Sequence, residues 1–445
     1  MHQSLRTLDQ LAIGDRAVVH RVDCAPRVGC RLMEMGLLPG TPVELVRRAP
    51  FGDPLEIRLR GYLLSLRRSE ASGVALRPEG QTALDDDDGR RADAVSAAPE
   101  RFPAHPPRAE PAGPRVPRVL VAGNPNAGKT TIFNALTGAR ARVGNYPGVT
   151  VSRASRRITL PSGASTELVD LPGTYSLSTH SPDEQVAVDE ILGRRGDPPD
   201  VVVVVVDAGA IERGLYLALQ VVESGGPTVV ELNMVDEAAA AGMEIDAGRL
   251  GEWLGARVVP TVAPAGQGLD ALRAAIGDTI GLPPRGDSAR IGLPATVESA
   301  VTDVEQALGG TQLSRTPAAR RSWAVWSLLS HESDEDDVEG LERPVREAVD
   351  AARRRAGADG VDLYEALITA RYRWIEAVVA DVRQGAASVR RTWTDRIDGI
   401  LTHKLYGMAA FAAVMALLFE ALFSWSEPFI GVIESAAGWL QSGVA

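Results

Sequence analysis

Apolar and polar residues follow three different periods along this chain of 445 residues. In residues 1–80 they alternate at the period of a β-strand, for example in the run LEIRL at 55–59. Turn sequences such as LPG at 38–40 and FGDP at 51–54 separate these runs. The region is predicted to be a small all-β barrel or sandwich, with one helical turn at residues 31–35 that ends at Gly36.

A second pattern covers residues 118–283, where short apolar runs alternate with helical stretches such as 215–222 and 269–276. The apolar runs lie at residues 119–122, 168–169, 201–206, 229–232 and 258–259. Strands that alternate with helices predict a parallel sheet covered on both faces. Ligands of such sheets bind beyond the carboxyl ends of the strands, so the turns after these runs are expected to carry the chemistry.

A third pattern predicts a helical subdomain at residues 284–398. Val297, Val301, Val304 and Leu308 recur at the spacing of one helix face, as do the apolar residues at 363, 367, 370, 374 and 378. The acidic stretch at 332–337 is interpreted as a solvated loop rather than as a metal site.

The chain beyond residue 398 is expected to meet a membrane. Residues 405–423 carry Glu420 as their only formal charge and are long enough to cross about 30 Å of hydrocarbon. Basic residues before this stretch place the preceding chain in the cytosol. We predict one transmembrane helix at 405–423, and an interfacial helix or the start of a second span at 428–445. A buried helix of a soluble protein is the alternative interpretation.

Composition narrows the function further. The net charge of -11 gives the chain no general attraction for nucleic acid, so no nucleic-acid partner is expected. Two cysteines, Cys24 and Cys30, make neither a four-cysteine zinc site nor a disulfide framework, which fits a reducing cytosol. Residues 81–117 combine an acidic run with many prolines and few large apolar residues, so they are predicted to be a flexible linker. Of the 47 basic residues, only Lys129 and Lys404 are lysines.

One glycine-rich turn matches the phosphate-binding motif G-x-x-x-x-G-K-[ST]. It runs from Gly123 to Thr130, follows the apolar run at 119–122 and opens a helical stretch. Its backbone N–H groups are expected to wrap phosphates at a helix N-terminus. Lys129 is expected to place its ammonium between the β- and γ-phosphates, and Thr130 to offer its hydroxyl to Mg²⁺.

The turns after other strands offer partners for this loop. Asp170 opens the sequence DLPG at 170–173 and can hold Mg²⁺ through water, while Gly173 can present its N–H to a γ-phosphate. Thr150, in the sequence VGNYPGVT at 143–150, is the expected second hydroxyl ligand of Mg²⁺. It lies on a loop that a γ-phosphate would order and hydrolysis would release.

The sequence NMVD at 233–236 follows the apolar run at 229–232. An ionised Asp236 accepts hydrogen bonds from the N1–H and the 2-amino group of guanine, whereas adenine offers neither donor. The carboxylate would be left unpaired beside adenine, so the expected nucleotide is GTP rather than ATP.

Together these motifs resemble the Ras-like GTPases and, within them, the ferrous iron transport protein B (FeoB) family. The resemblance is carried by residues 123–131, 143–151, 170–177 and 233–236, with Met234 where most other GTPases have Lys. The segment at 370–404 resembles the helical spacer of the family and its approach to the membrane. Residues 1–80 are similar to FeoA, the small SH3-like partner, in RLMEMGL at 31–37 and APFGDP at 49–54.

The resemblance implies a multidomain FeoA-FeoB fusion. Its expected parts are an SH3-like β-barrel at 1–80, a disordered linker at 81–117, an α/β Ras-like P-loop GTPase domain at 118–283, a helical spacer at 284–398 and the start of an α-helical membrane domain at 399–445. The transported ion would be Fe²⁺, with GTP hydrolysis gating or driving transport across the cytoplasmic membrane and the N-terminal domains facing the cytosol. The implied partners are membrane lipid, the FeoA-like domain in cis and further copies of the chain through the membrane part.

The membrane domain of the family has several spans, whereas about one is expected in this sequence. The alternative function is therefore a membrane-anchored regulatory GTPase switch that does not itself transport. A ribosome- or RNA-associated GTPase would need a basic RNA-binding unit, and the region after residue 283 is rich in acids as well as Arg.

The resemblance also implies particular roles at the site. Asn126 would help hold a K⁺ ion beside the β- and γ-phosphates in place of an arginine finger. Thr174 stands where Ras proteins have a water-positioning Gln, so slow turnover is expected. The loop that backs the guanine reads VAPAG at 262–266, and Pro264 supplies no N–H. The expected catalytic residues are Asn126, Lys129, Thr150 and Gly173. The expected nucleotide-binding residues are Asn124, Asn126, Ala127, Gly128, Lys129, Thr130, Thr131, Gly148, Val149, Thr150, Asp170, Gly173, Asn233, Met234, Asp236, Val262 and Ala263. Mg²⁺ is expected on Thr130, Thr150 and Asp170.

Overall fold

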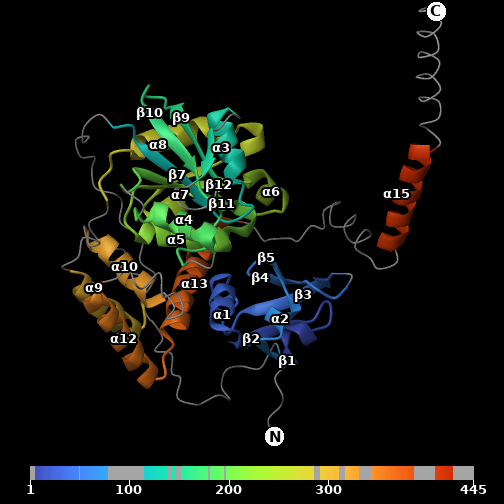
Figure 1. The fold of residues 1–445 in the computed structure, drawn as a ribbon, viewed down its shortest axis with the longest axis horizontal. Coiled ribbons are helices and arrows are strands. Elements are labelled where there is room, and N and C mark those ends of the chain that lie inside the picture. Colours follow the sequence, from blue (N-terminus) through green and yellow to red (C-terminus); the bar gives the residue numbers. More distant parts are fainter. Residues whose placement is uncertain are drawn as a thin grey trace, which may run out of the picture.

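The fold is that of a computed structural model that describes residues 6–49, 51–78, 115–138, 142–145, 152–178, 181–194, 197–284, 291–309, 316–329, 342–384 and 406–423. These residues form three packed units and one helix, α15, that stands apart from them (Figure 1). We call the three the β-unit (residues 6–78), the α/β unit (residues 118–280) and the helical unit (residues 295–382).

The β-unit is a six-stranded sheet in the order β1-β6-β2-β3-β4-β5, and all neighbouring strands are antiparallel. Its strands are β1 (Arg6–Thr7), β2 (Arg16–Val22), β3 (Pro42–Arg48), β4 (Leu55–Leu59), β5 (Tyr62–Leu66) and β6 (Val74–Pro78). In β4 the side chains of Leu55, Ile57 and Leu59 are buried, while the two polar residues between them are only half-buried. The predicted β-sheet structure is confirmed, and its closure into a barrel stays a prediction.

Short helices join the strands of the β-unit. They are η1 (Leu8–Gln10), α1 (Pro26–Glu34) and α2 (Arg68–Ala71). Helix α1 is longer than the single turn predicted at 31–35, because it already begins at Pro26, whose fixed φ suits the first turn of a helix. The chain leaves α1 at Gly36, where φ is +88°, a conformation that glycine adopts without strain.

The α/β unit contains a seven-stranded sheet in the order β14-β12-β11-β7-β10-β9-β8. Its strands are β7 (Arg118–Gly123), β8 (Arg142–Asn145), β9 (Ser152–Thr159), β10 (Ser165–Asp170), β11 (Val201–Asp207), β12 (Thr228–Asn233) and β14 (Arg257–Pro260). The strands from β14 to β10 run parallel, whereas β9 pairs antiparallel with both of its neighbours, β10 and β8. The expectation of a parallel sheet is therefore wrong at this edge. Strand β9 contains three arginines and no apolar run, so the sequence pattern does not reveal it.

Helices cover both faces of this sheet (Figure 1). They are α3 (Lys129–Thr137), α4 (Pro182–Ile191), η3 (Ala208–Ala210), α5 (Ile211–Glu223), α6 (Val235–Ala240), α7 (Ala247–Leu254), η4 (Ala263–Ala265) and α8 (Leu269–Thr279). All six valines of β11 are buried, and they alternate between two core clusters, one on each face of the sheet. This is the burial expected for a central strand of a doubly covered sheet.

The helical unit consists of α9 (Ala295–Leu308), α10 (Pro317–Leu329), α12 (Arg343–Ala358) and α13 (Leu363–Val382). The apolar faces predicted for α9 and α13 are both buried. Helix α13 packs on α5 and α7 of the α/β unit, and it also contacts α1 of the β-unit. A two-stranded ladder of β13 (Glu244–Ile245) and β15 (Arg383–Gln384) joins the end of the helical unit to the α/β unit.

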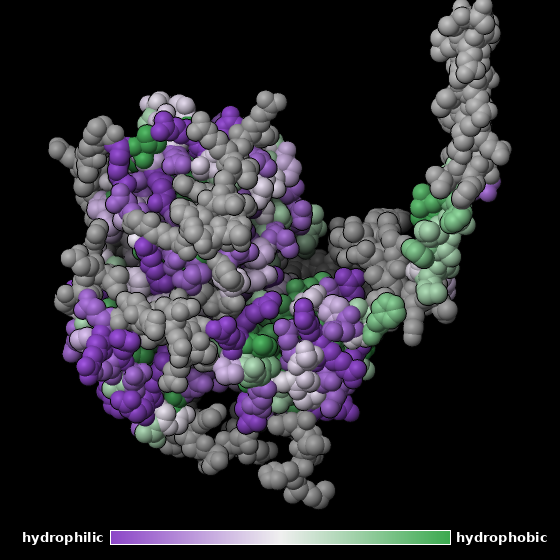
Figure 2. Space-filling view, viewed as in Figure 1, coloured by the Kyte–Doolittle hydropathy of each residue, from purple (hydrophilic) through white to green (hydrophobic). Residues whose placement is uncertain are grey.

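Helix α15 (Tyr406–Phe423) lies inside the stretch predicted to span a membrane. Large apolar side chains such as Met408, Phe411 and Leu417 are exposed along it. It is mostly green in Figure 2, where purple predominates among the other coloured residues. Within the described ranges, no helix meets the length and apolarity expected of a membrane span. The predictions made for residues 81–114, 332–337 and 428–445 lie outside the described residues.

Candidate nucleotide-binding site

The predicted phosphate-binding loop joins β7 to α3 at the carboxyl edge of the parallel strands. Helix α3 begins at Lys129, so the free N–H groups of its first turn lie next to the loop. Gly128 has a φ of +92°, and a Cβ atom there would overlap Nδ2 of Asn233. Asn126 has a φ of +66°, which is uncommon for a residue with a side chain. The loop is therefore tight and lined by backbone, as phosphate binding requires.

Lys129 lies buried beneath this loop, with 8% of its surface exposed. Its Nζ donates a hydrogen bond to the carbonyl oxygen of Asn124 over 2.7 Å. Burial lowers the pKa of Lys129 to about 8, although the nearby carboxylate of Asp170 acts in the opposite direction. A Cβ atom on Gly173 would lie 3.1 Å from the same Nζ. The ammonium group is thus held between the phosphate loop and the DLPG sequence.

Thr130 and Asp170 come from different elements and meet beside the loop. The Oγ1 of Thr130 donates to Oδ2 of Asp170 over 3.2 Å. The other carboxylate oxygen, Oδ1, is buried and has no hydrogen-bond partner among the residues that the structure describes. Burial raises the pKa of Asp170, while Lys129 and Thr130 act to lower it. A hydroxyl and an unsatisfied carboxylate oxygen form the hard oxygen donor set that suits Mg²⁺.

The residues after Asp170 continue along the loop. The N–H of Thr174 donates to the carbonyl oxygen of Gly123 over 3.2 Å, so the two sequences touch through their backbones. The hydroxyl of Thr174 is buried and donates to the carbonyl oxygen of Ser176 over 2.7 Å. Gly173 therefore lies against the phosphate loop, as a contact with a terminal phosphate requires.

Asn233, at the end of β12, is fastened to the phosphate loop. Its Nδ2 donates to the carbonyl oxygen of Ala127 over 3.1 Å, and its Oδ1 lies 3.3 Å from Oγ1 of Thr261. Met234 has a φ of +58°, which turns the chain into α6. Asp236 then lies exposed in the first turn of that helix. The two expected guanine-reading residues thus flank a tight turn beside the phosphate loop.

The sequence patterns did not single out two residues behind Asn233. Thr261 donates through its Oγ1 to Oε1 of Glu231, a fully buried residue of β12. Burial raises the pKa of Glu231 to about 8, and the hydrogen bond from Thr261 opposes this only in part. The sequence signal that could have pointed to this pair is Glu231, an acidic residue inside the apolar run at 229–232. Its spacing from Asn233 puts both side chains on the same face of the strand.

The remaining expected site residues fall into three groups. Val262 and Ala263 are buried at the start of the loop that contains η4, next to Thr261. Asn124 is buried with its Nδ2 donating to the backbone of Arg213, whereas Thr131 is exposed on α3. The third group, Gly148, Val149 and Thr150, lies outside the described residues.

Two family models match the chain. The one described as ferrous iron transport protein B matches residues 117–276, and the FeoA domain matches residues 6–78. The chain is similar to an Fe(2+) transport protein A/Fe(2+) transporter FeoB fusion protein of Porphyromonas gingivalis, with 33% identity over 98% of this chain and 54% of the relative. It is also similar to the Fe(2+) transporter FeoB of Escherichia coli K12, with 36% identity over 67% of this chain and 37% of the relative. The chain thus spans about half the length of the first relative and less of the second.

Solved structures agree with these matches. The cytosolic domain of L. pneumophila FeoB is 31% identical, with a TM-score of 0.52 over 60% of this chain and 99% of that one. A mutant of the S. thermophilus FeoB G-domain bound to GDP is 33% identical, with a TM-score of 0.53 over 60% of this chain and 100% of that one. The chain therefore belongs to the FeoB family of P-loop GTPases and carries a FeoA domain ahead of its GTPase domain.

Proposed function

We propose that this chain binds GTP with Mg²⁺ and hydrolyses it to GDP and phosphate, and that its nucleotide state gates or drives Fe²⁺ uptake across the cytoplasmic membrane. The observation that carries the proposal is the convergence of Lys129, Asp170 and Asn233, from three different elements, on one phosphate-binding loop. Each of these side chains contacts the loop or the first turn of α3 that follows it. Such convergence suits a nucleoside triphosphate better than a simple anion.

Hydrolysis would proceed by in-line attack of water on the γ-phosphate. Lys129 and the N–H of Gly173 would stabilise the charge that develops on the phosphate oxygens. The hydroxyl of Thr174 is already donated to Ser176, so it does not orient the attacking water as a longer Gln side chain would. Slow intrinsic turnover is expected for this reason.

Two ions fit the site to different degrees. Mg²⁺ would be held by Thr130 and Asp170, with Thr150 as a further ligand, because Asp170 keeps a buried oxygen beside the Thr130 hydroxyl that no described residue satisfies. When bound, Mg²⁺ neutralises charge on the phosphates. Asn126, exposed in the loop, would hold K⁺. Equal hydrolysis rates in K⁺ and Na⁺ would contradict this role of Asn126.

Guanine would be read at the other end of the loop. Asp236 is exposed and free to accept from the base, while Asn233 is fixed by Ala127 and Thr261. Val262, Ala263 and Met234 would form the walls against which the base lies. The GDP present in solved relatives supports this assignment.

The transport part of the proposal draws on the relatives, which are named as Fe(2+) transporters and extend beyond the length of this chain. We propose the domain division given by the sequence, with an SH3-like barrel in residues 1–80 acting in cis on the GTPase domain. The chain would meet membrane lipid through 405–423, where α15 exposes apolar side chains, with its preceding domains in the cytosol. Contacts between copies would form in this membrane part.

The test is to measure GTP hydrolysis and uptake of radioactive Fe²⁺ by cells that carry the gene for this chain as their only ferrous iron importer. Lys129→Ala should abolish both activities. Hydrolysis lost with uptake unchanged would contradict gating by the nucleotide. Hydrolysis without any Fe²⁺ uptake by the unaltered protein would favour the alternative of a membrane-anchored regulatory switch.

A further inference from the structure

One glutamate of the β-unit binds both other units at once. Glu34, at the end of α1, is 3% exposed. Its Oε2 accepts from the hydroxyl of Ser176 in the α/β unit over 2.8 Å, and its Oε1 accepts from the hydroxyl of Tyr364 in α13 over 3.0 Å. Its backbone carbonyl accepts from the hydroxyl of Tyr372, also in α13, over 2.6 Å. A buried carboxylate with one hydroxyl donor on each oxygen is a specific, satisfied contact rather than a chance encounter of surfaces.

The side chain of Arg213 links the β-unit and the α/β unit nearby. The guanidinium of Arg213, in α5, lies 4.3 Å from the ring centre of Tyr175 and 5.3 Å from the ring centre of Tyr62 in β5. The backbone carbonyl of Arg213 accepts from Nδ2 of Asn124 in the phosphate loop. The Tyr62 ring of the β-unit is therefore connected to the phosphate loop through Arg213, which contacts both Tyr62 and Asn124.

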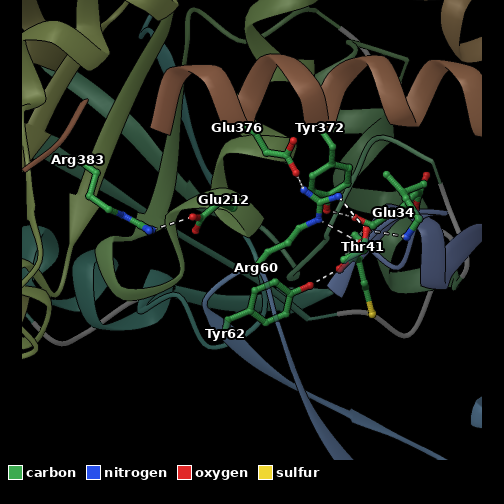
Figure 3. Close-up of polar contacts among 11 residues, drawn as sticks. Glu34, Thr41, Arg60, Tyr62, Glu212, Tyr372, Glu376 and Arg383 are labelled. Carbon is green, nitrogen blue, oxygen red and sulfur yellow. Dashed lines mark hydrogen bonds and ion pairs between the residues drawn. The ribbon is translucent and has the colours of Figure 1, made fainter. Parts of the chain in front are cut away.

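A separate contact joins the β-unit to α13 alone. Arg60 pairs with Glu376, and its guanidinium lies 4.5 Å from the ring centre of Tyr372 (Figure 3). Its Nε also donates to the carbonyl oxygen of Gly36 over 3.1 Å. A Cβ atom on Gly36 would lie 3.3 Å from the Tyr372 ring, so the two units approach closely here. This contact holds the β-unit in place without involving residues 174–178.

Apolar packing shows that the β-unit is docked rather than merely adjacent. Cys30 and Leu38 of the β-unit belong to the same buried cluster as the core between α5 and α13. In the other direction, Tyr175 and Ala210 of the α/β unit pack against the core of the β-unit. Shared apolar cores are typical of a stable contact between domains.

Residues 174–178, which we call the clamped segment, directly follow the DLPG sequence. Thr174 binds Gly123 of the phosphate loop at one end of the segment. Ser176 binds Glu34 in the middle, and the N–H of Leu177 donates to the side chain of Gln220 in α5 over 2.5 Å. In GTPases the segment after the γ-phosphate-sensing glycine changes conformation with the nucleotide. The β-unit therefore holds the part of the chain that a γ-phosphate would move.

We propose that the docked β-unit is a clamp on residues 174–178 that favours the GDP-bound form, so that GTP binding and docking weaken each other. This inference rests on the proposed function, because it needs a guanine nucleotide at the loop. GTP draws the N–H of Gly173 to its γ-phosphate, and this pulls on Thr174 and then on Ser176, which Glu34 holds. GDP exerts no such pull. Coupling between two binding events is reciprocal, so releasing the clamp raises the affinity for GTP relative to GDP.

The test compares dissociation constants of the full chain in detergent for fluorescent GDP and for a fluorescent, non-hydrolysable GTP analogue. Glu34→Ala removes the carboxylate oxygen that accepts from Ser176 in the clamped segment, together with the one that accepts from Tyr364 in α13, and it lies outside the nucleotide site. The ratio of the Kd for GDP to the Kd for the analogue is expected to rise about 5-fold or more. Glu44→Ala is the matched control, because the ion-pair partners of Glu44, Arg16 and Arg58, lie within the β-unit. This control should leave the ratio unchanged.

A second variant and a second measurement test the proposal even if Glu34→Ala does not fold. Arg60→Ala weakens docking through α13 and should shift the ratio in the same direction. In the unaltered chain, backbone amides of α1 should exchange hydrogen faster with the GTP analogue than with GDP. An unchanged ratio in both variants, or equal exchange with both nucleotides, would overturn the clamp while leaving the GTPase intact. A chain that binds neither nucleotide would overturn the proposed function itself.

Discussion

The hydroxyl of Thr130 lies 3.2 Å from one carboxylate oxygen of Asp170, whose second oxygen is buried and has no partner within the described part of the chain. If this pair holds Mg²⁺, Asp170→Asn removes the negative charge that attracts the ion. The Mg²⁺ concentration needed for half-maximal GTP hydrolysis should then rise about 10- to 100-fold. Titration of the hydrolysis rate with Mg²⁺ measures the shift. Asp200→Asn, at an acidic residue on the far side of the unit that pairs with Arg115, should leave the titration unchanged.

Arginine, the basic residue that this chain uses almost everywhere else, should not be able to replace Lys129. The ammonium fits in a buried space between Asn124 and Gly173, where a wide, planar guanidinium does not fit. Lys129→Arg is therefore expected to lower the GTP hydrolysis rate by about 100-fold or more, as Lys129→Ala should. Lys404→Arg is the matched control and should hydrolyse GTP at the original rate. Full activity of Lys129→Arg would show that only positive charge matters at this position.

Asp236 should determine which base is accepted. Because it is exposed in the first turn of α6, Asp236→Asn should not disturb the fold. The amide can pair with xanthine, which carries an oxygen where guanine has its 2-amino group, so the preference for GTP over XTP should fall by roughly 100-fold or more. Competition between GTP and XTP for the bound site gives this ratio. A preference that does not change would place the guanine elsewhere.

Glu231 should make the free energy of unfolding depend on pH. Burial raises its pKa from 4.5 to about 8, so between these values the folded chain keeps a proton that the unfolded chain releases. The free energy of unfolding contributed by this group is fully present below pH 4.5 and falls by about 1.4 kcal/mol per pH unit until Glu231 ionises in the folded chain near pH 8.

Glu231→Gln isolates this effect, because the amide oxygen still accepts the hydrogen bond from Thr261 and the side chain cannot ionise. Denaturant unfolding at pH 5 to 8.5 should show a shallower loss of stability for Glu231→Gln. The variant should be more stable than the original chain by about 2 kcal/mol or more near pH 8. Glu44→Gln, at a more exposed residue, serves as the control. Parallel curves for the original chain and Glu231→Gln would mean that Glu231 is ionised in the folded protein.

Local patterns predicted most of the α/β unit, because its buried strands are continuous apolar runs and its loop is a contiguous motif. They did not reveal β8 and β9, whose polar composition resembles that of a loop. The link from Glu231 to Asn233 needs the neighbouring strand β14 to bring Thr261 alongside, which no local sequence pattern encodes. Contacts such as Glu34 with Tyr364, separated by 330 positions, depend on how whole units dock.

The ladder of β13 and β15 ties the end of the helical unit to the α/β unit, at the point where the chain continues toward α15. After the helical unit the chain returns to the α/β unit at Arg383, whose guanidinium also pairs with Glu212 over 2.7 Å (Figure 3). Tension that arrives from the direction of α15 would therefore act on this ladder and on the ion pair of Arg383 with Glu212. Strand β13 follows α6, the helix that Met234 precedes and that carries Asp236. Helix α6, which carries the proposed guanine-binding residue Asp236, and the chain that continues toward α15 are thus tied to the same ladder.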